Sequence, residues 1–161
     1  VTIVLADFEL NDNTIDFSEM AVTANNSKGK MERNEITNNT RSLSSFKSEI
    51  DILDNTFTDF ENAVYAINST LLIENNFFTD GDFCIDLIDS DYELITNDFN
   101  CRNIDYQIRY NIRIQIADEY GIGSEDHLFD IFNSEGTQIV DSLTNEAGLS
   151  DYFKIDINYN E

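Results

Sequence analysis

An asparagine recurs in this sequence at a constant spacing of 21 residues, with no insertion or deletion between the copies. The five positions are Asn13, Asn34, Asn55, Asn76 and Asn97. The residue two positions later is apolar each time: Ile15, Ile36, Phe57, Phe78 and Phe99. A constant period of about 20 to 50 residues indicates a repeat architecture, in which each unit stacks on the next.

Other positions of the repeat follow the same rule. Counting columns 1 to 21 from Val1, apolar or small residues fill columns 1 and 3, then 6, 8 and 10, then 13 and 15. Column 10 reads Leu10, Met31, Ile52, Ile73 and Leu94, and column 6 reads Ala6, Ser27, Ser48, Ser69 and Ser90. Alternation within each group is typical of a β-strand, and the phase changes between groups. The pattern predicts three short strands per turn of a parallel β-solenoid.

The motif N-x-[FI]-[TN] carries a resemblance to a known family. It occurs as Asn34-Glu35-Ile36-Thr37, Asn55-Thr56-Phe57-Thr58, Asn76-Phe77-Phe78-Thr79 and Asn97-Asp98-Phe99-Asn100. With the serine column and the aliphatic strand after it, the motif resembles the right-handed parallel β-helix repeat of pectate-lyase-like proteins. The resemblance covers residues 1 to about 105 and implies an all-β fold of about five 21-residue coils. That family includes enzymes, adhesins and tail spikes, so the fold alone selects no function.

The column of asparagines predicts a ladder of amide hydrogen bonds. Equivalent residues on stacked coils lie about 4.8 Å apart, which lets the side-chain amides bond along the stack. A buried asparagine without partners costs about 1–3 kcal/mol. The ladder is therefore expected to be continuous.

The charge distribution limits the partners of the chain. Nine Lys and Arg oppose 32 Asp and Glu, for a formal net charge of −23. Nucleic acid is not expected to bind, because binding requires basic side chains that neutralise phosphates. No apolar run of about 18 residues is present, so no membrane-spanning segment is expected.

The basic residues of the second repeat lie between acidic ones. Lys28, Lys30 and Arg33 occupy columns 7, 9 and 12. The same columns hold Asp7, Glu9 and Asp12 in the repeat before, and Glu49, Asp51 and Asp54 in the repeat after. A site for acidic sugars is one interpretation. Three matched columns favour the other, a ladder of ion pairs between coils, each worth roughly 0.2–1 kcal/mol.

Two cysteines give information on the cellular compartment of the protein. Cys84 and Cys101 fall near the bend that closes a turn. A disulfide between adjacent coils would suit an extracellular or cell-surface location, and two free buried thiols are the alternative. Asn25, Asn38 and Asn68 match the N-x-[ST] acceptor pattern for glycosylation, which occurs by accident in a chain this rich in Asn, Ser and Thr.

Three aspartates are candidate ligands of a calcium ion. Asp80 and Asp82 lie on the bend at residues 79–83, and Asp59 is placed near them on the coil below. Carboxylates on a turn can bind Ca²⁺, although a solvated acidic bend is the simpler interpretation. No other cofactor is expected.

The repeat pattern ends after Asp105, where the core columns become polar. Strict alternation over residues 108–116 predicts a long half-buried strand, and turns near residues 118–121, 133–136 and 145–148 separate further strands. The spacing of residues 108–148 resembles immunoglobulin-like or carboxypeptidase-regulatory-like β-sandwiches. We therefore expect two domains, a β-helix over residues 1–105 and an incomplete antiparallel Ig-like module over residues 106–161.

These features favour a non-catalytic extracellular structural or adhesion module. No polar cap precedes the first coil, and two interpretations stay open. Either sequence upstream of Val1 covers its β edges, or copies of the chain or neighbouring domains pair with them, as in a filament or layer. The alternative is a polysaccharide-active or glycan-binding β-helix protein. Catalysis is disfavoured because the basic residues are already paired and His127 lies outside the repeat. Glycan binding would use exposed aromatics, with Phe60, Tyr65 and Phe83 as candidates.

Overall fold

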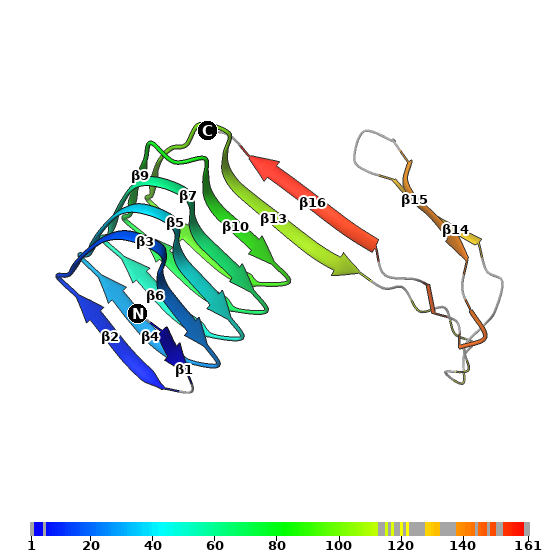
Figure 1. Cartoon of the computed structure of the whole chain (residues 1–161). Helices are drawn as coiled ribbons and strands as arrows, with labels where there is room; N and C mark the ends of the chain where they lie inside the picture. The colour runs from blue at the N-terminus through cyan, green and yellow to red at the C-terminus, as the bar shows by residue number, and fades with distance from the viewer. Residues whose placement is uncertain are drawn as a thin grey trace. The chain divides into compact units, whose positions relative to one another are not determined.

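The computed structural model describes residues 2–4, 6–112, 115, 117, 120, 122, 128–132, 138–143, 145–147, 149–150 and 153–159 of the 161-residue chain. The secondary structure of this part is all β. The repeats form coils, which we number one to five: residues 1–21, 22–42, 43–63, 64–84 and 85–105. Their strands stack in two sheets (Figure 1).

One short strand from each coil builds a five-stranded sheet. Its members are β2 (Asp7–Asn11), β4 (Lys28–Glu32), β6 (Glu49–Leu53), β8 (Thr70–Glu74) and β11 (Asp91–Ile95). All neighbours pair in parallel, and each pairing joins residues one repeat apart, such as Asp7 with Lys28 and Lys28 with Glu49. Like side chains therefore lie directly above one another.

The second sheet contains nine strands. They are β1 (Thr2–Val4), β3 (Thr14–Asn25), β5 (Glu35–Phe46), β7 (Thr56–Ile67), β9 (Phe77–Thr79), β10 (Phe83–Ile88), β12 (Asp98–Asn100), β13 (Ile104–Ile112) and β16 (Phe153–Tyr159). Pairing between coils is again parallel, with the same register. The predicted parallel β-solenoid of about five turns is confirmed.

The coils turn at three corners, and most corner positions in the described residues hold a residue other than glycine with a positive φ. Corner 1 is column 5, corner 2 is column 12 and corner 3 is column 17. The residues are Asn26, Lys47, Asn68 and Asp89 at corner 1, Asp12, Arg33, Asp54, Asn75 and Thr96 at corner 2, and Phe17, Asn38, Asp59 and Asp80 at corner 3. Asn and Asp tolerate this conformation better than other side chains, because their short polar groups bond locally.

The strand count per turn differs from the expected three in the first coils. β3, β5 and β7 are single strands of 12 residues that bend through corner 3. Strand pairing continues on both sides of the corner. Thr37 pairs with Thr58 before it, and Asn39 pairs with Phe60 after it. In the fourth coil the same run is divided into β9 and β10.

The core consists of the inward columns. Ile36, Phe57 and Phe78 of column 15 are fully buried. The rings of Phe57 and Phe78 stack with centroids 4.9 Å apart, and Phe78 stacks on Phe99 at 5.2 Å. Such stacking adds about 0.5–1.5 kcal/mol per pair to the burial of the rings.

The repeat register continues beyond Asp105. β13 pairs with β10 one repeat apart, through Ile88 with Arg109. Arg109 bonds to the carboxylate of Asp86 with Nε–Oδ1 at 3.1 Å, and both side chains are largely buried. This ion pair connects β10 to β13. Arg109 lies four residues after Asp105, where the sequence pattern ends.

The chain divides into two compact units, Val1–Tyr110 with Asp156–Glu161, and Asn111–Ile155. In the described part of the second unit, β14 (Leu128–Phe132) pairs antiparallel with β15 (Gln138–Leu143). An isolated antiparallel bridge joins Gln115 and Leu149. The Ig-like sandwich stays a prediction.

Candidate functional site

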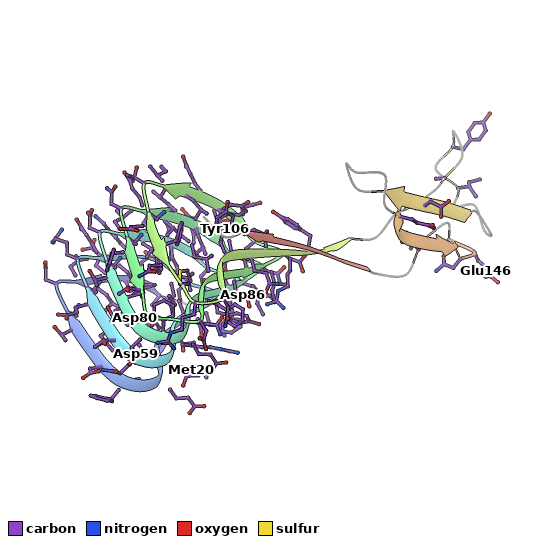
Figure 2. The ribbon with its side chains drawn as sticks, turned by 90° about the horizontal axis from the view of Figure 1, so that it is seen from above. Met20, Asp59, Asp80, Asp86, Tyr106 and Glu146 are labelled. Carbon is purple, nitrogen blue, oxygen red and sulfur yellow. A yellow bond between two sulfur atoms is a disulfide. The ribbon has the colours of Figure 1, made fainter. Side chains whose placement is uncertain are left out.

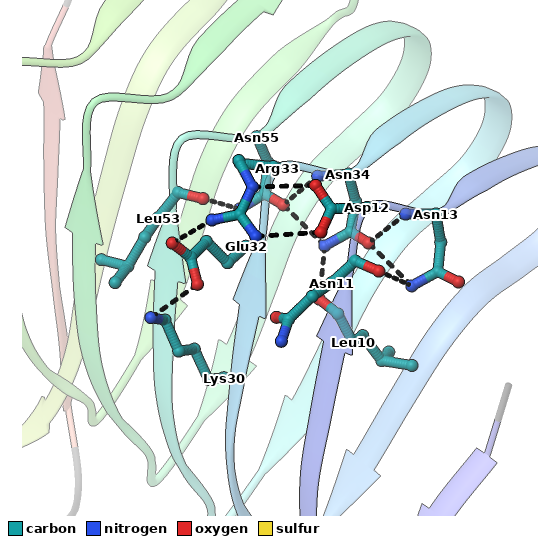
Figure 3. A network of polar contacts seen from close by, with 10 residues as sticks. All are labelled: Leu10, Asn11, Asp12, Asn13, Lys30, Glu32, Arg33, Asn34, Leu53 and Asn55. Carbon is teal, nitrogen blue, oxygen red and sulfur yellow. Dashed lines mark hydrogen bonds and ion pairs between the residues drawn. The ribbon is translucent and has the colours of Figure 1, made fainter.

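The asparagines of column 13 form a continuous ladder next to corner 2. The side-chain oxygen of each accepts the main-chain N–H of the asparagine one coil earlier, at 2.9 Å for Asn34 to Asn55 and for Asn55 to Asn76. It also accepts a side-chain N–H from the same residue, at 2.8 and 3.0 Å. Asn13 and Asn97 complete the column at its two ends. Figure 3 shows the lower rungs.

The second amide hydrogen of these side chains bonds to the main chain of the preceding strand. Nδ2 of Asn34 donates to the carbonyl oxygen of Leu10 at 2.7 Å, and Nδ2 of Asn55 donates to that of Met31 at 2.9 Å. Every polar atom of the buried asparagines is thereby used. Each buried asparagine thereby connects its own coil to the coil before it and to the coil after it, as Asn34 does to Leu10 and Asn55. This is a structural role.

Serines form a similar ladder next to corner 1. The main-chain N–H of Ser27, Ser48 and Ser69 donates to the hydroxyl of the serine one coil later, at 3.1, 3.2 and 3.1 Å. Each hydroxyl donates in turn to the carbonyl oxygen two residues earlier, as Ser48 does to Phe46 at 2.9 Å. The sequence shows this serine column, but its hydrogen bonds were not predicted. The constant spacing of the serines could have indicated a second ladder, as it did for the asparagines.

Charged columns 7 and 9 of the first three coils lie on the five-stranded sheet, and charged column 12 lies at corner 2, directly after its strands. Lys28 pairs with Glu49 of the coil above at 2.5 Å, and Arg33 pairs with Asp12 of the coil below at 2.8 Å. Lys30 instead pairs with Glu32 of its own strand at 2.7 Å, and Arg33 also contacts Glu32 (Figure 3). The ladder between coils thus holds for two columns, while Lys30 does not pair with Glu9 or Asp51.

These pairs shift the pKa values of their members in the directions expected of ion pairs. The hydrogen bond from Arg33 lowers the pKa of Asp12 below its ordinary 3.8. The hydrogen bond from Lys30 lowers the pKa of Glu32 below its ordinary 4.5. The carboxylate of Glu49 raises the pKa of Lys28. All of these groups stay charged near neutral pH.

Cys84 and Cys101 are joined in a disulfide, with their Cα atoms 5.9 Å apart. Cys84 is a residue of β10 and is fully buried in the core. The bond links the end of the fourth coil to corner 3 of the fifth coil. It closes a segment that contains the whole of β11.

The candidate calcium ligands are not gathered into one group. Figure 2 labels Asp59 and Asp80 on the coils, where both occupy corner 3 with positive φ. Oδ1 of Asp82 lies 3.8 Å from Nη1 of Arg102. In the described residues no cluster of three or more acidic, Cys or His side chains is arranged to hold a metal ion. His127 lies outside these residues.

The glycosylation and aromatic candidates have mixed surroundings. Asn68 is exposed, while Asn25 and Asn38 are half-buried, with Nδ2 of Asn38 bonded to Asp16 at 2.8 Å. Phe60 is only 5% exposed, and Phe83 is half-buried. Arg41 lies over the ring of Tyr65 at 4.5 Å. None of the three aromatics is a free platform for a sugar.

The fold and the ladders define a class of protein, a parallel β-solenoid with hydrogen-bonded corners. Comparisons with known protein families, with curated proteins and with solved structures found no match for the chain. No helix in the described part is long and apolar enough to cross a membrane.

Proposed function

We propose that this protein is a non-catalytic structural or adhesion module of an extracellular surface. It joins copies of itself or neighbouring domains through the exposed β edge of its first coil, as in a filament or layer. The observation that carries the proposal is a contrast within single columns. Ile52 and Asn55 of the third coil are 0% and 1% exposed, whereas Leu10 is half-buried and Asn13 is exposed in the first coil.

The edge consists of main-chain groups as well as side chains. β2 is the terminal strand of the five-stranded sheet in the described part of the chain. Column 7 donates its N–H toward the preceding coil, as Glu49 does to Ser27 at 2.9 Å. Because donors alternate along a strand, the N–H groups of Asp7 and Glu9 face the open edge. An extended segment can add there as a further strand.

The extracellular setting is supported by the disulfide between Cys84 and Cys101. Disulfides persist in oxidising compartments and are rare in the cytosol. Catalysis has little support in the first coils, because Lys28 and Arg33 already bond carboxylates.

Glycan binding is a second candidate, favoured by one exposed aromatic. Phe17 is 80% exposed at corner 3, in the same column as Asn38. A shallow groove of about 340 Å³ begins at Asn38 and continues to Glu61. A sugar ring could stack on Phe17 and bond to the polar groups of the groove. Loss of glycan-array binding in Phe17→Ala, with an unchanged melting temperature, would support this function.

Sedimentation velocity over a range of micromolar concentrations tests the main proposal. We expect concentration-dependent association that Glu9→Pro abolishes, because proline removes one donor from the open edge. Glu9→Ala is the matched control, since it removes the same charge and keeps the N–H. A chain that stays monomeric throughout would contradict assembly through this edge.

A further inference from the structure

One face of the nine-stranded sheet points away from the core. There β3, β5, β7, β10 and β13 lie side by side in parallel register (Figure 1). Columns 1 and 3 of these strands are buried, as Leu43 and Ser45 are in β5. Because side chains alternate between the two faces of a strand, columns 2 and 4 point outward.

Column 20 precedes these columns and is likewise exposed or half-buried. We call the described residues of the three outward columns the low-charge face: Met20, Arg41, Asn62 and Phe83 of column 20, Thr23, Ser44, Tyr65, Asp86 and Gln107 of column 2, and Asn25, Phe46, Ile67, Ile88 and Arg109 of column 4.

The low-charge face is almost free of acidic residues in a chain of net charge −23. Among its residues Asp86 alone is acidic, and it is bonded to Arg109 with Nε–Oδ1 at 3.1 Å. The five-stranded sheet differs, because columns 7 and 9 each carry a charged residue in four of the five coils. Carboxylates are therefore concentrated on other surfaces of the first unit.

The centre of the low-charge face is apolar. Phe46, Ile67 and Ile88 are paired on adjacent strands, and each is half-buried. The ring of Tyr65 lies 6.2 Å from that of Phe46, and Arg41 lies over Tyr65. Aromatic residues, Met and Arg are enriched at protein interfaces, whereas Lys, Asp and Glu are depleted. The composition of this face is thus that of an interface.

We infer that two copies of this chain pair through the low-charge face, sheet against sheet. An apolar sheet face is stabilised by a second layer, and a twofold contact uses the same patch on both copies. This contact goes beyond the edge contact of the proposed function, because it lies on the sheet face of coils two to five.

Charge favours a second copy over other partners. A basic partner would find its carboxylates on the five-stranded sheet, as at Glu49 and Asp51. An acidic partner would be repelled by the net charge of the chain. Two copies joined at the low-charge face bury apolar side chains together and bring no unpaired carboxylate of this face against another.

The side chains of this face are held in place before contact. Arg41 lies 4.5 Å from the centre of the Tyr65 ring, and Phe46 meets that ring edge to face. Ser44, which pairs with Tyr65 in the sheet, is fully buried among these larger neighbours. Side chains that are already ordered lose little freedom on association.

The size of the face predicts a weak dimer. Five strands at about 4.8 Å spacing and six residues at about 3.3 Å rise give a face of about 19 by 20 Å. Two such faces amount to about 800 Å², below the roughly 1,200–2,000 Å² of stable interfaces. We expect a dissociation constant of about 0.1–1 mM. Weak contacts of this kind suffice where many copies are held together, as in the layer proposed above.

NMR spectra of the labelled full chain test this contact, recorded from tens of micromolar to about a millimolar. We expect the amide signals of Phe46, Tyr65, Ile67 and Ile88 to shift with concentration, and those of β4, β6 and β8 to stay constant. Added salt should strengthen the association, because it screens the repulsion between acidic copies.

Two variants make the test specific. Ile67→Lys places a charge at the apolar centre of the face and should weaken association at least about tenfold. Leu72→Lys is the matched control, since Leu72 is also half-buried on a strand but belongs to the five-stranded sheet. It changes the net charge equally and should leave association unchanged.

The native chain decides the question even where Ile67→Lys fails to fold. Signals of the low-charge face that stay constant over the whole concentration range would overturn the inference. Equal weakening by Ile67→Lys and Leu72→Lys, with both variants folded by circular dichroism, would also overturn it.

Glu9→Pro separates this contact from assembly through the first coil. It should abolish the edge contact and leave the concentration-dependent shifts of Tyr65 and Ile67 in place. Shifts that persist in a chain without edge assembly would contradict the proposed function and support the face contact. Shifts that disappear in Glu9→Pro would do the reverse.

Discussion

The side-chain oxygen of Asn76 accepts two hydrogen bonds from Asn55, one from the main-chain N–H at 2.9 Å and one from Nδ2 at 3.0 Å. The oxygen thus takes the place of a main-chain carbonyl directly after corner 2, before the next strand begins. An aspartate could accept these bonds but could not donate onward to the next oxygen. The requirement for both a donor and an acceptor explains why the column is asparagine.

Replacing Asn55 by alanine should be strongly destabilising. Two donors of Asn34 would lose their acceptor in the core, and each buried unsatisfied group costs about 1–3 kcal/mol. We expect the free energy of unfolding in urea to fall by about 2–5 kcal/mol.

Asn13→Ala is the matched control for that variant. Asn13 is exposed, and its side chain donates to Asn11 and Asn34. Its loss should cost less than about 1 kcal/mol. Equal costs at the two positions would show that the ladder does not hold the coils together.

Gly81 cannot carry a side chain while Phe60 keeps its place. A Cβ atom at Gly81 would lie 1.9 Å from the ring of Phe60, which is buried. Gly81→Ala should therefore cost about 1–3 kcal/mol, and Phe60→Leu should recover part of that loss in a double-mutant cycle.

Gly29→Ala provides the comparison, because its Cβ would meet the ring of Phe8 at 2.4 Å. Phe8 is half-buried on the first coil and can move outward. A smaller loss at Gly29 than at Gly81, measured by the same urea titration, is the expected result. Additive effects of Gly81→Ala and Phe60→Leu would contradict the contact.

Reduction of the disulfide should loosen the fifth coil. Cys84 and Cys101 are 17 residues apart, and closing a loop of this size stabilises a fold by roughly 3 kcal/mol. We expect a reductant to lower the melting temperature of the native chain and to leave Cys84→Ser with Cys101→Ser unaffected. Equal melting temperatures with and without reductant would indicate that the bond contributes nothing to stability.

Thr96 is the least suitable residue of its corner. It has φ 52°, a conformation that β-branched side chains disfavour, while the same column holds Asn75 and Asp54. Thr96→Asn should stabilise the chain by up to about 1 kcal/mol, seen as a higher urea midpoint. Thr70→Asn, on a strand at an exposed position, should give no gain.

The pair between Arg33 and Asp12 predicts a pH dependence. Because the hydrogen bond lowers the pKa of Asp12 from 3.8, it stabilises the folded chain above that value and is lost as pH falls through the lowered pKa. The difference in melting temperature between the native chain and Arg33→Gln should shrink below about pH 4. Lys47→Gln removes the same charge at corner 1 and should show no such change.

The sequence predicted the solenoid, the inward columns and the position of the ladder, because each depends on which residue types recur every 21 positions. The stacking of Phe57 on Phe78 follows from that register alone. The pairing of Lys28 and Arg33 across coils was likewise readable from the signs of neighbouring columns.

Other features depend on geometry that a column pattern does not contain. Lys30 bonds to Glu32 because its flexible side chain reaches along its own strand as well as across coils. Phe60 of the third coil fills the space next to Gly81 of the fourth coil in the same column, so a large and a small residue compensate each other where the column rule expects similar residues. The continuation to Arg109 was missed because columns 8 and 10 become polar, at Arg113 and Gln115, although columns 1 and 3 keep Tyr106 and Ile108 and the strand pairing persists.

Side-chain amide NOE measurements on the labelled protein test the stacked register most directly. If the coils stack in this register, we expect cross-peaks from the Nδ2 hydrogens of Asn55 and Asn76 to the asparagine amides one repeat away, in a series that links Asn13 to Asn97. Cross-peaks at any other separation, or none between these asparagines, would contradict it.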